Sequence, residues 1–195
     1  LSKLCSLGYI EGYYGGFPRV DKDLIQEYAK GLIATTGGIS GEIPDLILNT
    51  GEHQAEEAFR WWLEVFGNDF YVELQRHGLE EEDRVNEVLL RMADKYGVKV
   101  IATNNVYYAK KEEASAHDTL RCVKNNEVLS TPVGRGRNFR FGMPNHEFYL
   151  KTETEMKQLF ADRPDAITNT FEIAEKAEEL TLQRDILLPK FTIPD

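Results

Sequence analysis

The sequence predicts an α/β domain in which parallel strands alternate with helices. Three runs rich in apolar and β-branched residues, 32–36, 69–75 and 98–102, have the length and composition of buried strands. Segments with helical periodicity separate these runs, and glycines or polar residues end each one. Alternation of this kind implies right-handed crossovers between parallel strands, in either a closed barrel or an open sheet.

Composition bounds the function. The 195 residues, 42% of them hydrophobic, are enough for one substantial core. A net charge of −10 gives no general attraction for nucleic acid, so any such contact would be local. Cys5 and Cys122 have no paired spacing, as expected in a reducing compartment, and no membrane span or basic leader is visible. We therefore expect a cytoplasmic protein without a membrane partner.

The first elements are short. Apolar residues at near-helical spacing predict the end of a helix over 1–10, and three glycines make 11–16 a loop. Asp21 is a candidate N-cap for a helix over 22–29, which Gly31 ends. After the first strand, a glycine pair and residues 40–44 predict another loop.

The middle of the chain carries the clearest helices. Within 53–67 the apolar residues fall on one face, which predicts core packing rather than a cofactor site: Ala55, Ala58, Phe59, Trp62, Leu63 and Phe66. After the second strand the period is again helical, with Gly97 as the stop: Val85, Val88, Leu89, Met92, Ala93 and Tyr96. The acidic run 80–83 at the start of this helix is interpreted as solvated and favoured by the helix dipole, not as a metal site.

Polar residues follow the third strand, where α/β folds carry their chemistry: Asn104, Asn105, Tyr107 and Tyr108. None is a strong metal ligand. A helix is predicted over 112–124, with Ala116, Leu120 and Val123 facing inward. The segment 135–141 interleaves basic and aromatic residues, which suits either nucleic-acid contact or an ordinary exposed loop.

The carboxyl-terminal part, 151–195, is predicted to be a helical extension of a domain over 1–150. Thr152 and Glu155 form a capping box, and Pro164 opens the last helix. The chain begins at Leu1 rather than methionine, so we expect it to be a piece of a longer protein.

Several motifs, taken together and in order, resemble the PHP (polymerase and histidinol phosphatase) domain of bacterial replicative DNA polymerase α subunits. Two loops carry the resemblance best: Ile33-Ala-Thr-Thr-Gly-Gly-Ile-Ser-Gly-Glu-Ile43 and Ala102-Thr-Asn-Asn-Val-Tyr-Tyr108. Shorter matches occur at 8–14, 18–21, 73–78, 116–118, 147–151 and 188–191. The resemblance covers essentially the whole chain.

The resemblance implies a segment of a distorted seven-stranded (β/α) barrel with a helical elaboration. It also implies that the family's metal-ligating cysteine, aspartate and histidine are replaced here by Gly38, Asn105 and Tyr107. The family's His-x-His motif would lie before Leu1, and the polymerase's catalytic aspartates after Asp195. We therefore expect no catalytic residue, metal or cofactor in this segment, and Mg²⁺ in the polymerase domain of the parent protein.

By resemblance, the leading hypothesis is a scaffolding PHP segment of a protein that synthesises DNA from deoxynucleoside triphosphates. Its expected partners are the polymerase core of the same chain, DNA, and a separate proofreading exonuclease subunit. One alternative is a metal-dependent phosphoesterase of the 3′–5′ exonuclease type, which needs converging ligands. Another is an unrelated α/β interaction module.

The remaining candidates for chemistry are the histidines. His77 follows a strand and could be a ligand or base, but a hydrogen-bonded structural role is favoured because no partner follows at a ligand spacing. Adjacent helical positions make His117 and Asp118 a poor acid/base pair, and Cys122 lies about 140° from His117 around the helix. His53 and His146 have no recognisable setting.

Overall fold

The centre of the fold is a parallel sheet of three short strands. In the computed structural model, which describes residues 1–134, 136–177 and 183, the sheet order is β1 (Ala34–Thr35), β2 (Phe70–Leu74), β3 (Val100–Ala102). All pairing is parallel, with Ala34 opposite Phe70 and Val72 opposite Val100. The predicted alternation of parallel strands and helices is thus confirmed, while closure into a seven-stranded barrel stays a prediction.

Three helices cover one face of the sheet: α3 (Glu42–Asn49), α4 (Glu52–Phe66) and α5 (Glu80–Tyr96). The short 3₁₀ turn η1 (Gly67–Asp69) leads from α4 into β2. Because side chains alternate along a strand, β2 sends Phe70, Val72 and Leu74 into the core beneath these helices, and Tyr71 and Glu73 to the other face. All three core residues are almost fully buried.

The apolar stripes of α4 and α5 form the core as predicted. Ala55, Ala58 and Phe59 of α4 are buried, and the ring of Phe59 packs edge-on against Phe70. Gly97 ends α5 in the left-handed region, with φ of 66°. Among the helices that the structure describes, none is both long and apolar enough to cross a membrane.

The loop predicted over 40–44 is wrong in part, because α3 begins at Glu42. Pro44 suggested a break, but it lies in the first turn, where a backbone N–H needs no partner within the helix. Ile43, Pro44 and Ile47 of α3 are buried in the core.

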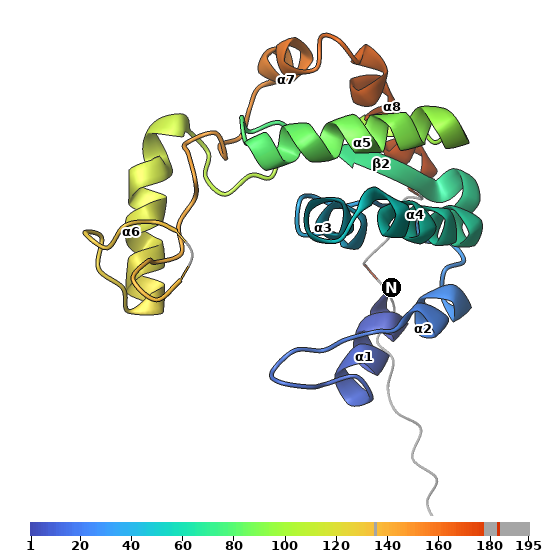
Figure 1. The fold of residues 1–195 in the computed structure, drawn as a ribbon, viewed down its shortest axis with the longest axis horizontal. Coiled ribbons are helices and arrows are strands. Elements are labelled where there is room, and N and C mark those ends of the chain that lie inside the picture. Colours follow the sequence, from blue (N-terminus) through green and yellow to red (C-terminus); the bar gives the residue numbers. More distant parts are fainter. Residues whose placement is uncertain (135, 178–182, 184–195) are drawn as a thin grey trace, which may run out of the picture.

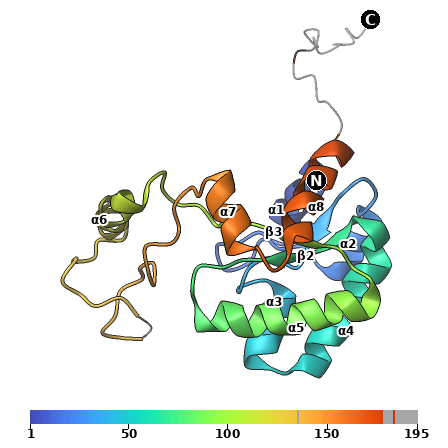
Figure 2. The ribbon, with the colours of Figure 1, turned by 90° about the horizontal axis from the view of Figure 1, so that it is seen from above.

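The helix α8 (Pro164–Lys176) packs on β3, on the opposite side of the sheet from α5 (Figure 2). Its Asn169 donates a hydrogen bond to the carbonyl oxygen of Val100 at 2.8 Å. The preceding helix α7 (Glu153–Leu159) begins with the predicted capping box. Phe160 and Ala166 belong to the same core as the sheet. The boundary at 150 stays a prediction, and the motif 188–191 lies outside the described residues.

The amino-terminal helices are α1 (Ser2–Ile10) and α2 (Lys22–Glu27). The predicted N-cap is confirmed, since Asp21 accepts a hydrogen bond from the Leu24 amide at 2.8 Å. The predicted packing of the first helix on Leu1, Leu4, Cys5 and Leu7 holds only in part. Leu4 is buried and Leu7 half-buried, while Leu1 and Cys5 are exposed.

The helix α6 (Ala114–Asn125) stands apart from the sheet together with the loop that follows it (Figure 1). It follows the 3₁₀ turn η2 (Lys111–Glu113). Its predicted inward face is wrong: Leu120 and Val123 are 66% and 75% exposed, and Ala116 is exposed too. The helix instead packs its opposite side, with Ala114 and Cys122 buried. Periodicity located an apolar face, but here no sheet lies beneath it.

Candidate functional site at the carboxyl ends of the strands

The carboxylate of Glu73 joins the ends of all three strands. It accepts hydrogen bonds from the hydroxyl of Thr35 at 2.7 Å and from the hydroxyl of Thr103 at 2.6 Å. The side-chain amide of Gln75 donates to the same carboxylate at 2.8 Å and to the Thr103 hydroxyl at 3.2 Å. We call Thr35, Glu73, Gln75 and Thr103 the strand-end network. The Glu73 carboxylate is the one anionic group of this network, and its hydrogen-bond donors are neutral. Hydrogen bonds, rather than a positively charged partner, therefore stabilise the carboxylate.

Gln75 also fills the space that a side chain at position 38 would need. A Cβ built on Gly38 would lie 2.7 Å from Oε1 of Gln75, closer than real Cβ contacts allow. The Gln75 amide is held in that place by the strand-end network. Gly38 itself has no ligand atom, and a side chain at position 38 would have to displace Gln75 from these hydrogen bonds.

The other two positions at which the resemblance implies a replaced ligand, Asn105 and Tyr107, lie on the loop after β3. Asn105 is exposed, and Tyr107 is 49% exposed with its ring 5.6 Å from that of His117. The residues that the structure describes contain no cluster of three or more His, Cys, Asp or Glu side chains able to hold a metal ion. The donors present here are neutral amides, hydroxyls and one carboxylate, and they do not fit the metal centre that the PHP resemblance implies.

The first turns of α5 fix the segment that follows β2. Asn86 donates a hydrogen bond from Nδ2 to the backbone oxygen of Gln75 at 2.8 Å. His77, two residues after Gln75, makes two hydrogen bonds with the carboxylate of Glu82. One is through the backbone amide of His77 at 2.5 Å and the other through Nδ1 of its ring at 2.6 Å. These contacts orient the backbone from which the Gln75 side chain extends.

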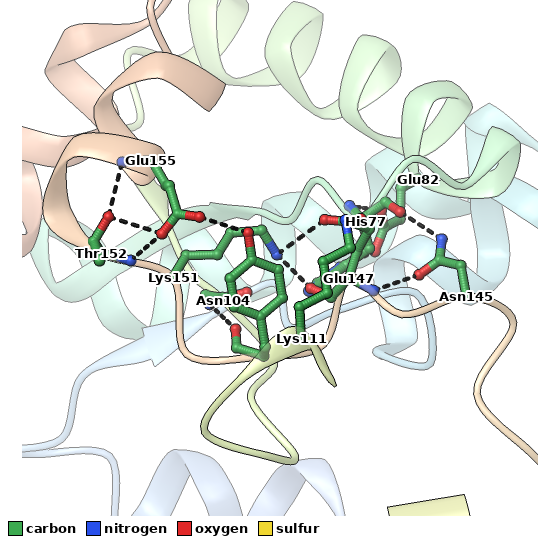
Figure 3. A network of polar contacts seen from close by, with 10 residues as sticks. His77, Glu82, Asn104, Lys111, Asn145, Glu147, Lys151, Thr152 and Glu155 are labelled. Carbon is green, nitrogen blue, oxygen red and sulfur yellow. Dashed lines mark hydrogen bonds and ion pairs between the residues drawn. The ribbon is translucent and has the colours of Figure 1, made fainter. Parts of the chain in front are cut away.

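His77 is a buried, hydrogen-bonded residue, as predicted. It is 2% exposed, its ring stacks on Phe148 at 4.4 Å, and its carbonyl oxygen accepts from Asn145 at 2.7 Å (Figure 3). Its Nε2 has no partner among the described residues. The prediction of a solvated acidic run is wrong for Glu82, which is 3% exposed. Helical periodicity did not reveal this partner, because His77 lies five residues before Glu82 and outside the helix.

A second group of polar residues continues from this pair along 147–155 (Figure 3). Tyr149 donates to Glu155 at 2.7 Å, which raises the pKa of Tyr149 to about 12 and lowers that of Glu155 to about 2. Burial lowers the pKa of Lys151, which bonds to Glu147. Asn104 ties the loop after β3 to this segment through the carbonyl oxygen of Tyr149, at 2.9 Å.

The histidine and cysteine candidates on α6 do not form a catalytic group. Asp118 makes a bidentate pair with Arg140, both distances being 2.6 Å, and this pairing lowers the pKa of Asp118. His117 turns instead toward Tyr107 and Tyr108. Asp118 and His117 therefore contact different partners, as their adjacent positions on the helix predicted. Cys122 is buried and is not in a disulfide.

Of the two alternatives for segment 135–141, neither an exposed loop position nor nucleic-acid contact holds for Arg140, which is 5% exposed and paired with Asp118. Arg135 lies outside the described residues. The two remaining histidines are exposed, and His53 lies 3.9 Å from Glu57. Neither histidine contributes to the strand-end network.

Sequence reasoning missed the strand-end network. One signal was available: Glu73 is a charged residue inside an apolar strand, which requires a partner when its neighbours are buried. The partners themselves, on β1 and after β3, follow only from the register of the sheet.

The sequence was compared with family models and with known proteins. Residues 1–77 match the family model described as PHP domain. The chain is 40% identical over 195 residues to the DNA polymerase III subunit alpha of Borreliella burgdorferi, covering 100% of this chain and 16% of that protein. It is 36% identical over 203 residues to the same subunit of Thermus aquaticus, with the same coverage, and 37% identical over 195 residues to that of Treponema pallidum.

The small parallel sheet among helices is consistent with a PHP domain, the class to which the match over residues 1–77 points. Within that class, the chain belongs to the family of DNA polymerase III α subunits and corresponds to their PHP region. The chain spans about 16% of the length of these relatives.

Proposed function

We propose that this chain is a scaffolding segment of the PHP domain of a replicative DNA polymerase α subunit and that its metal site has been lost. Under this proposal the parent protein copies DNA from deoxynucleoside triphosphates, with Mg²⁺ bound in its polymerase domain. Its partners would be the polymerase core of the same chain, DNA and a separate proofreading exonuclease subunit.

The observation that carries the loss of the metal site is the position of Gln75. An amide occupies the space beside Gly38, where the PHP resemblance implies a metal ligand, and two hydroxyls and an amide satisfy the nearby Glu73. Hydrogen bonds thus hold the strand ends together in place of metal coordination.

Metal content of the full-length protein, measured by elemental analysis after extensive dialysis, tests the proposal. Hydrolysis of a 3′ single-stranded DNA end is measured on the same preparation. The polymerase domain is expected to bind Mg²⁺ weakly, so the relevant result is the amount of zinc, manganese or iron retained. We expect less than stoichiometric transition metal and no hydrolysis.

A Glu73→Gln variant separates the two interpretations further. Under the scaffold proposal it changes neither metal content nor hydrolysis, because no metal depends on Glu73. Stoichiometric metal in the unmodified protein that is lost in Glu73→Gln would refute the proposal and favour a metal-dependent phosphoesterase.

A further inference from the structure

A cavity of about 420 Å³ lies beside α6, away from the strand-end network. Its wall includes two aromatic residues, Tyr107 and Phe141, and two cations, Arg121 and Lys124. The volume lies within the range of roughly 300–1,000 Å³ that is typical of ligand pockets. Among the described residues, the hydrophobic core contains none of these four side chains.

The two cations are available for an anion. Arg121 donates a hydrogen bond to the sulfur of Met143 at 3.4 Å. Among the described residues, no carboxylate oxygen lies within 4.0 Å of a side-chain nitrogen of Arg121 or Lys124, so neither forms a salt bridge there. The nearest acidic neighbour on the helix, Asp118, is already bonded to both terminal nitrogens of Arg140. The protein as a whole has a net charge of −10, but these two side chains place positive charge beside this cavity.

The aromatic residues offer flat surfaces for stacking. The guanidinium of Arg121 lies 4.0 Å from the ring centre of Phe141, and Phe141 remains 62% exposed. Phe139, two residues earlier on the same loop, is 49% exposed. Exposed aromatic rings beside cations can stack bases while the cations contact phosphates.

We propose that this cavity binds single-stranded nucleic acid, with a base stacked on Phe141 and a phosphate held by Arg121 and Lys124. An acidic peptide would also meet the cations, but the two exposed rings, Phe141 in the cavity wall and Phe139 two residues before it, offer stacking surfaces that suit bases better. The site goes beyond the scaffolding role and requires no metal.

The test is a fluorescence anisotropy titration of fluorescein-labelled oligothymidylate at low ionic strength with the 195-residue chain, after a cooperative urea transition has shown that this chain folds on its own. Phe141→Ala is expected to weaken binding by roughly 5- to 100-fold, the loss of one base–aromatic stack. Phe141→Trp keeps a stacking surface and should bind like the unmodified chain. Because Phe141 is exposed, these substitutions should leave the circular dichroism spectrum unchanged.

A pair of charge-matched variants tests the phosphate contact. Lys124→Gln should reduce the slope of log K against log salt concentration by about 0.7, the value for one phosphate contact on a single strand. Lys3→Gln removes the same charge from an exposed position on α1 and should leave the slope unchanged. Equal effects of the two lysine variants would indicate nonspecific charge and overturn the site.

Three other results would overturn the proposal. These are no anisotropy change at low ionic strength, equal affinity of Phe141→Ala and the unmodified chain, and equally tight binding of polyglutamate with the same dependence on Phe141. The last result would assign the cavity to acidic peptides. All of them are independent of the metal measurement that tests the scaffolding role.

Discussion

The buried pair of His77 and Glu82 makes the sharpest prediction about stability. Replacing Glu82 with alanine removes the acceptor for both the backbone amide and Nδ1 of His77. Each hydrogen bond to a charged group contributes about 1.5–3 kcal/mol, and breaking a buried charged contact by removing one partner costs about 3–5 kcal/mol. We therefore expect Glu82→Ala to lower the free energy of unfolding by about 3–5 kcal/mol.

Urea unfolding followed by circular dichroism measures this change. For an m-value of about 2 kcal/mol/M, a loss of about 4 kcal/mol moves the midpoint down by about 2 M. Glu82→Gln keeps the shape and one acceptor oxygen, so it should lose about half as much. The slope of the transition should stay the same, because the core is unchanged.

The matched control is Glu81→Ala, one residue earlier in the same helical turn and exposed to solvent. It removes the same charge from the positive end of the helix dipole, which is worth about 0.3–1 kcal/mol. If Glu82→Ala and Glu81→Ala lowered stability equally, the double contact to His77 would contribute nothing, and the reasoning from burial would be refuted.

Three further predictions follow from other contacts. Gly38→Ala should lower the free energy of unfolding by about 1 kcal/mol because it displaces Gln75 from its hydrogen bonds, and this loss should disappear in a Gln75→Ala background; a urea double-mutant cycle measures the difference. The depressed pKa of Glu155, about 2, contributes stability that is present above pH 4.5 and lost as the pH falls toward 2, so the acid-induced loss of stability should be smaller in Glu155→Gln. Arg140→Ala leaves Asp118 without its bidentate partner and should loosen the loop after α6, seen as faster amide hydrogen exchange in 131–145 with the sheet unaffected.

The central elements could be predicted from sequence because their patterns are local. The strand β2 and the helices α4 and α5 each carry a periodic apolar face, and in each case that face packs in the core. The face of α6 is equally periodic at Ala116, Leu120 and Val123, yet it is exposed. Periodicity reports that a face exists, whereas burial depends on which other element reaches it.

The candidate site divides in the same way. The motifs around Gly38, Asn105 and Tyr107 could be noticed in the sequence. The strand-end network could not be predicted, since Gln75, Thr35 and Thr103 meet Glu73 only once three strands are in register. Glu82 is a further case, because its partner is fixed by the turn between β2 and α5.

The segment that contains α6 leaves the body of the protein and returns to it at one place. Tyr108 and Tyr149 form a parallel bridge, and the amide of Leu150 donates to the carbonyl oxygen of Tyr108 at 3.0 Å. Because departure and return are side by side, residues can be gained or lost between them without moving the sheet. Evolution can therefore remodel this excursion, and the surface it presents, more freely than the rest of the domain, and homologues should differ in length here first.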